Sequence, residues 1–377
     1  MIMRALSEEE LIDFIHGAAI YGTGGGGSIS GAMRLLREAR DMNLKFNLVH
    51  PDEVPDDAII ACPYGVGGGV QEEIRKRFSS LPRLSQREVV SMAVEALEAH
   101  LGREIYGFIP GELGAGNSFL AMYMAALTGK AIVDGDTVGR SVPEVVHSTF
   151  TLCSVPITPF VIATPFGDLM LVTRVLNDRR AEDIDRFMAV ASGGGVTVID
   201  HPITGERLRK SIILNSISKS IEVGRSIREA REGRISPIEP LLRSTGGYIL
   251  FLGEIDEVVR EDRDGFIWGN IRLRGSDKFK DQIYEIWFKN ENLVTWLDGE
   301  PHVTCPDLVS VIDPETAQAL SNWGDDLARG RRVAVIGIRA PDIWRTKAGL
   351  DILGPRYFGY NIEYRPIEEV IRGRQTP

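Results

Sequence analysis

One stretch constrains the fold of this chain more than any other, and it spans residues 111–144, GELGAGNSFLAMYMAALTGKAIVDGDTVGRSVPE. The run before it, REIYGFIP, has the length of a strand, and Asn117 or Ser118 is a suitable N-cap for the apolar helix that follows. Gly129 is a suitable C-cap, and AIVD then reads as a second buried strand. A strand–helix–strand unit makes its two strands parallel through a right-handed crossover.

The loops after two such strands emerge at the same edge of the sheet, where open α/β sheets bind their ligands. Glu112 follows the first strand, and Asp134 and Asp136 follow the second. Neighbouring strands lie about 4.8 Å apart. We therefore expect that these three carboxylates can share one pocket. The alternative for Asp134 and Asp136 is a plain turn, because Asp-Gly-Asp is ordinary turn composition.

The predicted elements divide the chain at about residue 235. Strands alternate with helices in the first part, which is typical of an α/β domain with a largely parallel sheet. Gly233 and Pro237 then indicate a linker, and Asp264-Gly265 is a strong hairpin signal within a series of alternating strands. We predict an α/β domain over residues 1–235 and a β-rich domain over 236–377, which agrees with a length of 377 residues.

Two glycine-rich loops need a physical explanation. The first, GTGGGGS (residues 22–28), joins two helices and contains Gly24, Gly25 and Gly26. Glycine is typical of close backbone approach to a ligand, although a hinge between helices is the alternative. The loop follows a helix and lacks a GK[ST] ending, so we expect no nucleotide. The second, PYGVGGG (residues 63–69), follows a strand that ends near Cys62, which we interpret as a core residue.

Composition narrows the class of protein. A net charge of −10 and the lack of a dense Lys/Arg block argue against nucleic acid as the main partner. No apolar run is long enough to span a bilayer, and the N-terminus lacks the order of a signal peptide. Three widely spaced cysteines suit a reducing compartment. We expect a cytoplasmic protein with a small-molecule substrate, not bound to a membrane, which could form a homo-oligomer.

Several motifs together resemble a known family. GTGGGGS, GELGAGNS, DGDTVGRSVPE and, near the C-terminus, PDLVSVID and GRRVAVIGIRAPDIWRTKAGLDILGPRYFGY occur in the order found in the S-methyl thiohydantoin desulfurase family. This family was long catalogued as a domain of unknown function, often near hydantoinase and oxoprolinase-type proteins. The resemblance covers Ser7 to Tyr360 and implies an α/β domain followed by a β-rich domain.

The resemblance implies hydrolysis of an S-methylated thiohydantoin at its C2 carbon, which releases methanethiol. Such a reaction needs one carboxyl group as base and one as acid. We expect Glu112, Asp134 and Asp136 to supply them. Backbone N–H groups of GELGAGN (residues 111–117) or GTGGGG (residues 22–27) could hold the ring carbonyl oxygens, and Arg140 could pair with a substrate carboxylate. The expected substrate-binding residues are Gly24, Gly25, Gly26, Gly114, Asn117 and Arg140.

Each of these roles has an alternative. Arg140 could instead pair with Glu144, and Asn117 could be only a helix cap. Asp134, Asp136 and His147 are weak candidates for a divalent metal site, but no HxH or HExxH spacing supports one and no metal is assigned. His201 and His302 are also weak metal candidates. His302 and Cys305 could instead form a nucleophile pair, although Pro306 and the strand after it favour a structural cysteine. The alternative function is a non-catalytic metabolite-binding or partner subunit of a hydantoinase- or oxoprolinase-type system.

Overall fold

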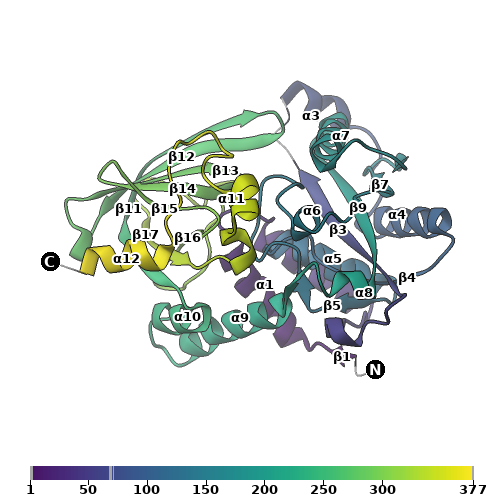
Figure 1. Cartoon of the computed structure of the whole chain (residues 1–377), viewed down its shortest axis with the longest axis horizontal. Helices are drawn as coiled ribbons and strands as arrows, with labels where there is room; N and C mark the ends of the chain where they lie inside the picture. Colours follow the sequence, from purple (N-terminus) through teal and green to yellow (C-terminus); the bar gives the residue numbers. More distant parts are fainter. Residues whose placement is uncertain (1–2, 68–69, 71, 376–377) are drawn as a thin grey trace.

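A computed structural model describes residues 3–67, 70 and 72–375 of the chain. Gly68 and Gly69 of the second predicted glycine loop lie outside these residues. Figure 1 shows two bodies, each built on its own sheet, with the N-terminal body coloured purple to teal and the C-terminal body green to yellow. The predicted combination of an α/β domain and a β-rich C-terminal domain is confirmed.

The N-terminal sheet has eight strands and is mixed. The second to fifth strands in spatial order run parallel to one another, and the strands on both sides of them pair antiparallel. In spatial order the strands are β1 (Arg4–Ala5), β2 (Asn47–Val49), β5 (Ala131–Val133), β4 (Ile105–Phe108), β3 (Ile59–Gly67), β9 (Gly195–Thr204), β7 (Phe160–Ala163) and β8 (Leu169–Val172).

The predicted strand–helix–strand unit is present, and its strands are immediate neighbours. Strands β4 and β5 pair parallel, with Gly107 opposite Ala131, and helix α5 (Ala115–Leu127) connects them. The helix begins earlier than expected, because Gly114 occupies the N-cap position that we assigned to Asn117 or Ser118. Asn117 therefore lies in the first turn of the helix, where its side chain can reach neighbouring loops.

The helices of the N-terminal body follow from local signals. Helix α1 (Glu8–Tyr21) begins with a complete capping box of Ser7 and Glu10, and helix α4 with one of Ser85 and Glu88. Helix α4 spans Gln86–Leu101, and the remaining helices of this body are α2 (Ile29–Asp41), α3 (Glu72–Ser79), α6 (Thr149–Leu152), α7 (Asp178–Ala191), α8 (Gly205–Leu208) and α9 (Ser216–Glu232). Helix α10 (Ile238–Thr245) follows the predicted boundary at residue 235 and packs against α9. A two-stranded sheet of β6 (Gly135–Asp136) and β10 (Ile213–Leu214) joins the loop after β5 to the start of α9.

The C-terminal body is a seven-stranded antiparallel sheet. Its longest hairpin turns at Asp264-Gly265, as predicted, and both residues have positive φ, at 55° and 78°. In spatial order the strands are β15 (Glu300–Thr304), β14 (Glu291–Leu297), β13 (Ile283–Lys289), β12 (Phe266–Gly275), β11 (Tyr248–Arg263), β17 (Arg332–Ile338) and β16 (Leu308–Ile312). Helices α11 (Lys347–Leu353) and α12 (Ile367–Gln375) complete the body.

Across residues 3–67, 70 and 72–375, none of the helices is both long and apolar enough to cross a membrane.

Candidate active site

The first glycine loop and the loop after β4 pack directly against each other through their backbones. The Gly26 carbonyl accepts the N–H groups of Gly116 and Asn117, at 2.9 and 3.0 Å. A Cβ on Gly26 would lie 2.6 Å from the Gly114 Cα, and one on Gly27 would lie 2.8 Å from the Gly116 Cα. The glycines of both motifs are thus required by the approach of the two loops to each other.

The C-terminal body holds the other side of the first glycine loop. The backbone N–H of Asn292 donates to the Thr23 carbonyl, and that of Asn322 donates to the Gly24 carbonyl, both at 2.8 Å. A Cβ on Gly24 would meet the Asn322 side chain at 2.4 Å. Gly24 therefore packs against protein, whereas Gly26, Gly27 and Ser28 line a large cleft.

Glu112 is buried and its carboxylate accepts three hydrogen bonds. Asn117 Nδ2 donates to Oε1 at 2.7 Å, while the Ser141 hydroxyl and the Val142 N–H donate to Oε2 at 2.7 and 2.8 Å. The loop after β5 thus meets Glu112 as expected, but through Ser141 and Val142. Burial is the largest effect on the Glu112 carboxyl and raises its pKa, and the three donors oppose that rise.

The second carboxyl group of the site is Glu291, the first residue of β14 in the C-terminal body. Its Oε1 lies 2.9 Å from the Ser141 hydroxyl, and its Oε2 is buried without a partner among the described residues. A Cβ on Gly25 would lie 1.9 Å from Glu291 Oε1, so the glycine makes room for the carboxyl group. Burial, followed by the charge of Glu112, raises the pKa of Glu291 to about 8.

The hydrogen bonds of Ser141 bear on which of the two carboxyl groups is ionised and which is protonated. A hydroxyl group carries one proton and can donate only one hydrogen bond. Because the pKa of Glu291 is raised to about 8, we expect its carboxyl group to be protonated at neutral pH and to donate to the Ser141 oxygen, which leaves the Ser141 proton for Glu112. The pair therefore holds one carboxylate and one carboxylic acid, the separation of pKa values that acid–base catalysis requires.

A cleft of about 730 Å³ opens at this pair, between the two bodies. Both carboxyl groups line it, together with Asn117, whose Oδ1 accepts the Gly65 N–H at 3.2 Å. Arg186 also lines the cleft. Its Nε donates to Glu182 Oε1 at 2.5 Å, and its guanidinium group stacks on the Phe266 ring. The first glycine loop forms the rim through residues 26–28. This volume is that of a small-molecule site.

Asp134 and Asp136 point away from this cleft and toward helix α9. The Ser218 backbone N–H donates to Asp134 Oδ1 at 3.0 Å, and the Ser218 hydroxyl donates to Oδ2. Asp136 accepts the N–H groups of Val138 and Gly139 at 2.9 and 2.6 Å and the Ser216 hydroxyl at 2.5 Å. Burial raises the pKa of Asp136 to about 6. The expected shared pocket therefore does not include these two carboxylates, because they hold the start of α9 and a tight turn.

Arg140 is buried, and protein acceptors occupy its guanidinium group. Nε donates to the Ser141 carbonyl, Nη1 to the carbonyls of Pro306 and Asp307, and Nη2 to the Asn292 carbonyl, at 2.9–3.2 Å. Nη2 also donates to the Thr23 hydroxyl at 3.0 Å. These five hydrogen bonds use all five N–H donors of an arginine, so no donor remains for the substrate carboxylate that we expected. The alternative pairing of Arg140 with Glu144 is not formed either, because Glu144 contacts Lys289 and Tyr357.

His147 is fully buried beside Tyr357 and Phe358, and neither ring nitrogen has a hydrogen-bond partner among the described residues. Burial lowers the pKa of His147 to about 3, so the ring is neutral. Within the described part of the chain, no three His, Cys, Asp or Glu side chains are grouped so that they could hold a metal ion. His147 is separated from Asp134 and Asp136, which are engaged with α9.

The remaining histidine and cysteine candidates lie outside the cleft lining. His302 Nδ1 is 3.0 Å from the Tyr284 hydroxyl in the C-terminal core, and burial raises the pKa of Cys305 to about 12. Neither observation supports a nucleophile pair. Cys62 is buried, and its pKa lies well above the ordinary value because of burial and nearby Asp200.

Sequence reasoning missed Glu291 and Ser141. The hairpin between β13 and β14 carries four consecutive polar residues, KNEN at 289–292, and all four are buried. A hairpin tip is normally exposed, so a polar run there gives no signal of a site. The interruption of two apolar strands by this run is the only sequence cue, and it does not reveal that the turn faces another domain.

Models of two domains of one protein family together match nearly the whole chain. The description "S-Me-THD-like, N-terminal domain" matches residues 9–174, and "S-Me-THD-like, C-terminal domain" matches residues 176–367. No curated protein matches the chain. An X-ray crystal structure of a protein from Chromobacterium violaceum has the same fold, with 22% identity, a TM-score of 0.78, and coverage of 97% of this chain and 100% of that one. The chain therefore belongs to the S-Me-THD-like family, the family of S-methyl thiohydantoin desulfurase.

Proposed function

We propose that this protein is a hydrolase that removes the S-alkyl group of a small S-alkylated thiohydantoin and releases a thiol. Family membership supports the substrate class. The observation that carries the proposal is the pair of Glu112 and Glu291, linked by the Ser141 hydroxyl at 2.7 and 2.9 Å in a cleft of about 730 Å³. One member is ionised and the other protonated, as a hydrolysis of this kind requires.

The first step would add water to the C2 carbon of the ring. Glu112, as the carboxylate, takes a proton from the attacking water. Glu291, as the acid, gives its proton to the ring nitrogen when the C=N bond opens. The product is a tetrahedral carbon that bears a hydroxyl group, the alkylthio group and two nitrogens. The net charge of the enzyme is conserved, since Glu112 gains a proton from water while Glu291 loses its own proton to the ring nitrogen.

The second step would reverse both roles. The hydroxyl group gives its proton to Glu291 and becomes the carbonyl oxygen of the hydantoin. The C2–S bond breaks with its electron pair on sulfur, and sulfur takes the proton held by Glu112. The thiol leaves, and both carboxyl groups return to their starting states. Gly26, Gly27, Ser28 and Asn117 line the cleft, which supports the proposal that they contact the ring.

Thiol release from S-methyl thiohydantoin, followed with a thiol-reactive dye, tests the proposal. Glu112→Gln and Glu291→Gln should each lower kcat by roughly 10²–10⁴-fold, as expected for loss of a general acid or base. Asp134→Asn is the matched control, because this carboxylate lies beside α9 and outside the cleft. It should keep kcat within about threefold, since the variant changes only a capping contact worth about 1 kcal/mol.

The alternative of a non-catalytic, metabolite-binding subunit gives a different result. The parent protein would then bind the hydantoin, as isothermal calorimetry can measure, but release no thiol. The same absence of release across S-methyl, S-ethyl and S-propyl substrates would refute the proposed hydrolase.

A further inference from the structure

A second, smaller cavity of about 80 Å³ adjoins the cleft at Glu112, and we refer to it as the inner chamber. Six residues line both cavities and form the neck between them: Gly65, Val66, Glu112, Asn117, Val142 and Arg186. The side chains that line only the inner chamber include Cys62, Val145, His147, Phe150, Asp200 and His201. Its walls are therefore partly apolar and partly polar, and Glu112 is the acid–base group at its entrance.

An irregularity in the sheet brings His201 into this chamber. Along the β3–β9 pair, Ile60 lies opposite Ile203 and Cys62 lies opposite Asp200, so β9 has one residue more than β3 between these partners. His201 takes the extra position with φ of 42°, a left-handed conformation that is rare for a residue with a side chain. Consecutive strand residues normally point to opposite faces, but here Asp200 and His201 line the same cavity.

The bulge also orients the imidazole ring. His201 Nδ1 lies 2.8 Å from Asp200 Oδ1, and the other oxygen of Asp200 accepts the Tyr64 hydroxyl at 2.8 Å. His201 and Asp200 are almost completely buried. Asp200 Oδ1 has no hydrogen bond among the described residues, so the contact brings a ring nitrogen and a carboxylate oxygen together without fixing the tautomer, and His201 Nε2 has no partner there either.

The chamber contains polar atoms whose partners are missing from the described residues. These atoms are His201 Nε2, Asp200 Oδ1 and both ring nitrogens of His147. A buried polar atom without a partner costs free energy, so we expect water beside these atoms in the free protein, and a group with weak donor or acceptor capacity, such as a thiol, can replace it. The volume corresponds to about two or three water molecules. It could thus hold a group of two or three non-hydrogen atoms.

We propose that the inner chamber is the subsite for the S-alkyl group, so that the ring stays in the cleft while the small thiol forms beyond Glu112. The proposal rests on the proposed function. Phe150, Val145 and Cys62 offer apolar contact to a methyl group, and the free nitrogens of His201 and His147 suit a thiol, a weak donor and acceptor. The position of Glu112 at the neck agrees with its second role. The C2–S bond breaks with its electron pair on sulfur, and sulfur takes the proton that Glu112 accepted from water.

The test compares S-methyl, S-ethyl and S-propyl thiohydantoins by kcat/KM for thiol release. Phe150→Leu enlarges the chamber and Val145→Phe reduces it, and neither residue is in the acid–base pair. Leu84→Val is the matched control, because Leu84 lines only the cleft. Phe150→Leu should raise the S-propyl to S-methyl ratio of kcat/KM by about tenfold, the effect of two buried methylene groups. Val145→Phe should lower this ratio, and Leu84→Val should leave it unchanged.

Each outcome is decisive. Unchanged ratios in both chamber variants, with normal thiol release by the parent protein, would overturn the subsite and leave the proposed function intact. The chamber would then hold only water. A ratio that shifts in Leu84→Val alone would place the S-alkyl group in the cleft. No thiol release from any substrate would overturn the proposed function and the subsite together. Thermal unfolding verifies that each variant is folded. If Phe150→Leu does not fold, the ratio of kcat/KM measured for Val145→Phe decides the test.

Discussion

At the scale of residues, the site depends on a carboxyl group that the protein keeps protonated. The only polar contact of Glu291 among the described residues is Ser141, and Glu112 lies just beyond this hydroxyl. The buried guanidinium group of Arg140 uses its donors on the Thr23 hydroxyl and on backbone carbonyls, and none of them on Glu291. Burial, and then the negative charge of Glu112, raises the pKa of Glu291 and keeps it an acid, and the charges of Arg140 and Arg186 only partly oppose this rise.

Glu291→Gln should alter how stability depends on pH. The pKa of Glu291 rises from 4.5 to about 8 on folding, so the folded protein keeps a proton that the unfolded chain loses in this range. The free energy of unfolding contributed by Glu291 is therefore fully present below pH 4.5 and is lost as the pH rises to about 8. Glutamine does not titrate. The Tm of the variant minus that of the parent should thus increase from pH 5 to pH 8, and a constant difference would contradict the assignment.

The pH dependence of activity should have an alkaline limb from the same group. Above pH about 8 Glu291 loses the proton that it must give to the ring nitrogen. We expect kcat/KM for thiol release to fall above this pH. The pair titrates as a unit, so the measured values belong to both carboxyl groups. A profile that stays flat to pH 10 would show that Glu291 is not the acid.

Residues that follow a strand in the chain could be predicted, and residues contributed by another domain could not. Glu112 and Asn117 follow β4 directly, and both line the cleft. Asp134 follows β5 in the same way, but a nearby helix start supplies its partner in Ser218. Sequence position places such a side chain at the right edge of the sheet without saying which way it points. Glu291 lies far along the chain from Glu112, and only tertiary packing brings the two together.

At the scale of elements, the first glycine loop (residues 22–28) and the loop after β4 form one packed unit. Their crossing leaves no space for side chains at Gly26 and Gly114, and the Gly26 carbonyl caps the start of α5 through Gly116 and Asn117. The carbonyls of Thr23, Gly24 and Gly26 all accept hydrogen bonds from protein. The pattern of glycines correctly indicated close approach of the backbone. It did not distinguish approach to a ligand from approach to another loop, because both require the absence of a Cβ.

Gly26→Ala should harm both stability and activity, and Gly102→Ala offers a matched control. The two glycines have similar φ, at 69° and 64°, but a Cβ at Gly102 would meet nothing within 4 Å. Left-handed strain alone costs an alanine about 1–2 kcal/mol at either position. Gly26→Ala must also separate the loops that carry Asn117 and Glu112, so we expect a larger loss of unfolding free energy and a fall in kcat of at least about tenfold. Equal effects of the two substitutions in urea unfolding and thiol release would refute this role.

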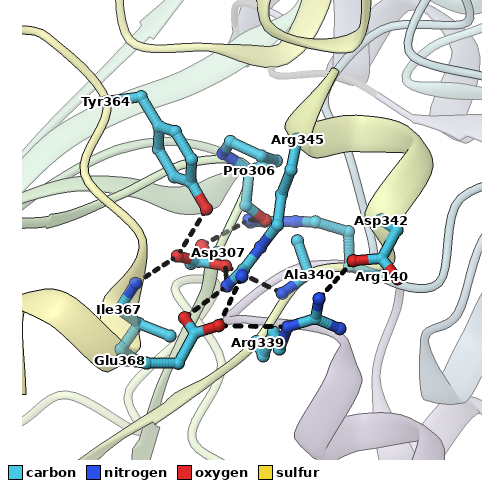
Figure 2. A network of polar contacts seen from close by, with 10 residues as sticks. All are labelled: Arg140, Pro306, Asp307, Arg339, Ala340, Asp342, Arg345, Tyr364, Ile367 and Glu368. Atoms are coloured by element: carbon cyan, nitrogen blue, oxygen red, sulfur yellow. Dashed lines mark hydrogen bonds and ion pairs between the residues drawn. The ribbon is translucent and has the colours of Figure 1, made fainter.

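At the scale of the whole molecule, Arg140 and Asp307 join the two bodies. Figure 2 shows the Asp307 carboxylate surrounded by donors from the C-terminal segment. Oδ1 accepts the Ala340 N–H and Arg345 Nη2 at 2.8 and 2.7 Å, and Oδ2 accepts the Tyr364 hydroxyl and the Ile367 N–H, both at 2.9 Å. The Asp307 carbonyl accepts Arg140 from the N-terminal body. Asp307 thereby links Ile367, at the start of α12, to Arg140, which precedes Ser141 in the chain.

This connection explains why a site made of two domains can be rigid. Ser141 touches both Glu112 and Glu291, and its neighbour Arg140 donates to the Asn292 carbonyl, next to Glu291. The distance between the two carboxyl groups is therefore set by a buried guanidinium group rather than by a flexible linker. A pre-organised acid and base need such support, because small displacements reduce the rate of proton transfer.

Arg140→Lys should consequently lower stability and activity together. Lysine keeps the charge but has three donors instead of five, and it cannot reproduce the planar geometry, so buried carbonyls lose their partners. We expect the free energy of unfolding to fall by about 3 kcal/mol or more in urea titrations. The remaining folded protein, assayed at low temperature, should show a lower kcat because the carboxyl groups of Glu112 and Glu291 are no longer held at a fixed distance from each other. Arg243→Lys, on the exposed face of α10, is the control and should change stability by no more than about 0.5 kcal/mol. If Arg140→Lys behaved like this control, the guanidinium group would not be what holds the two bodies and the carboxyl pair together.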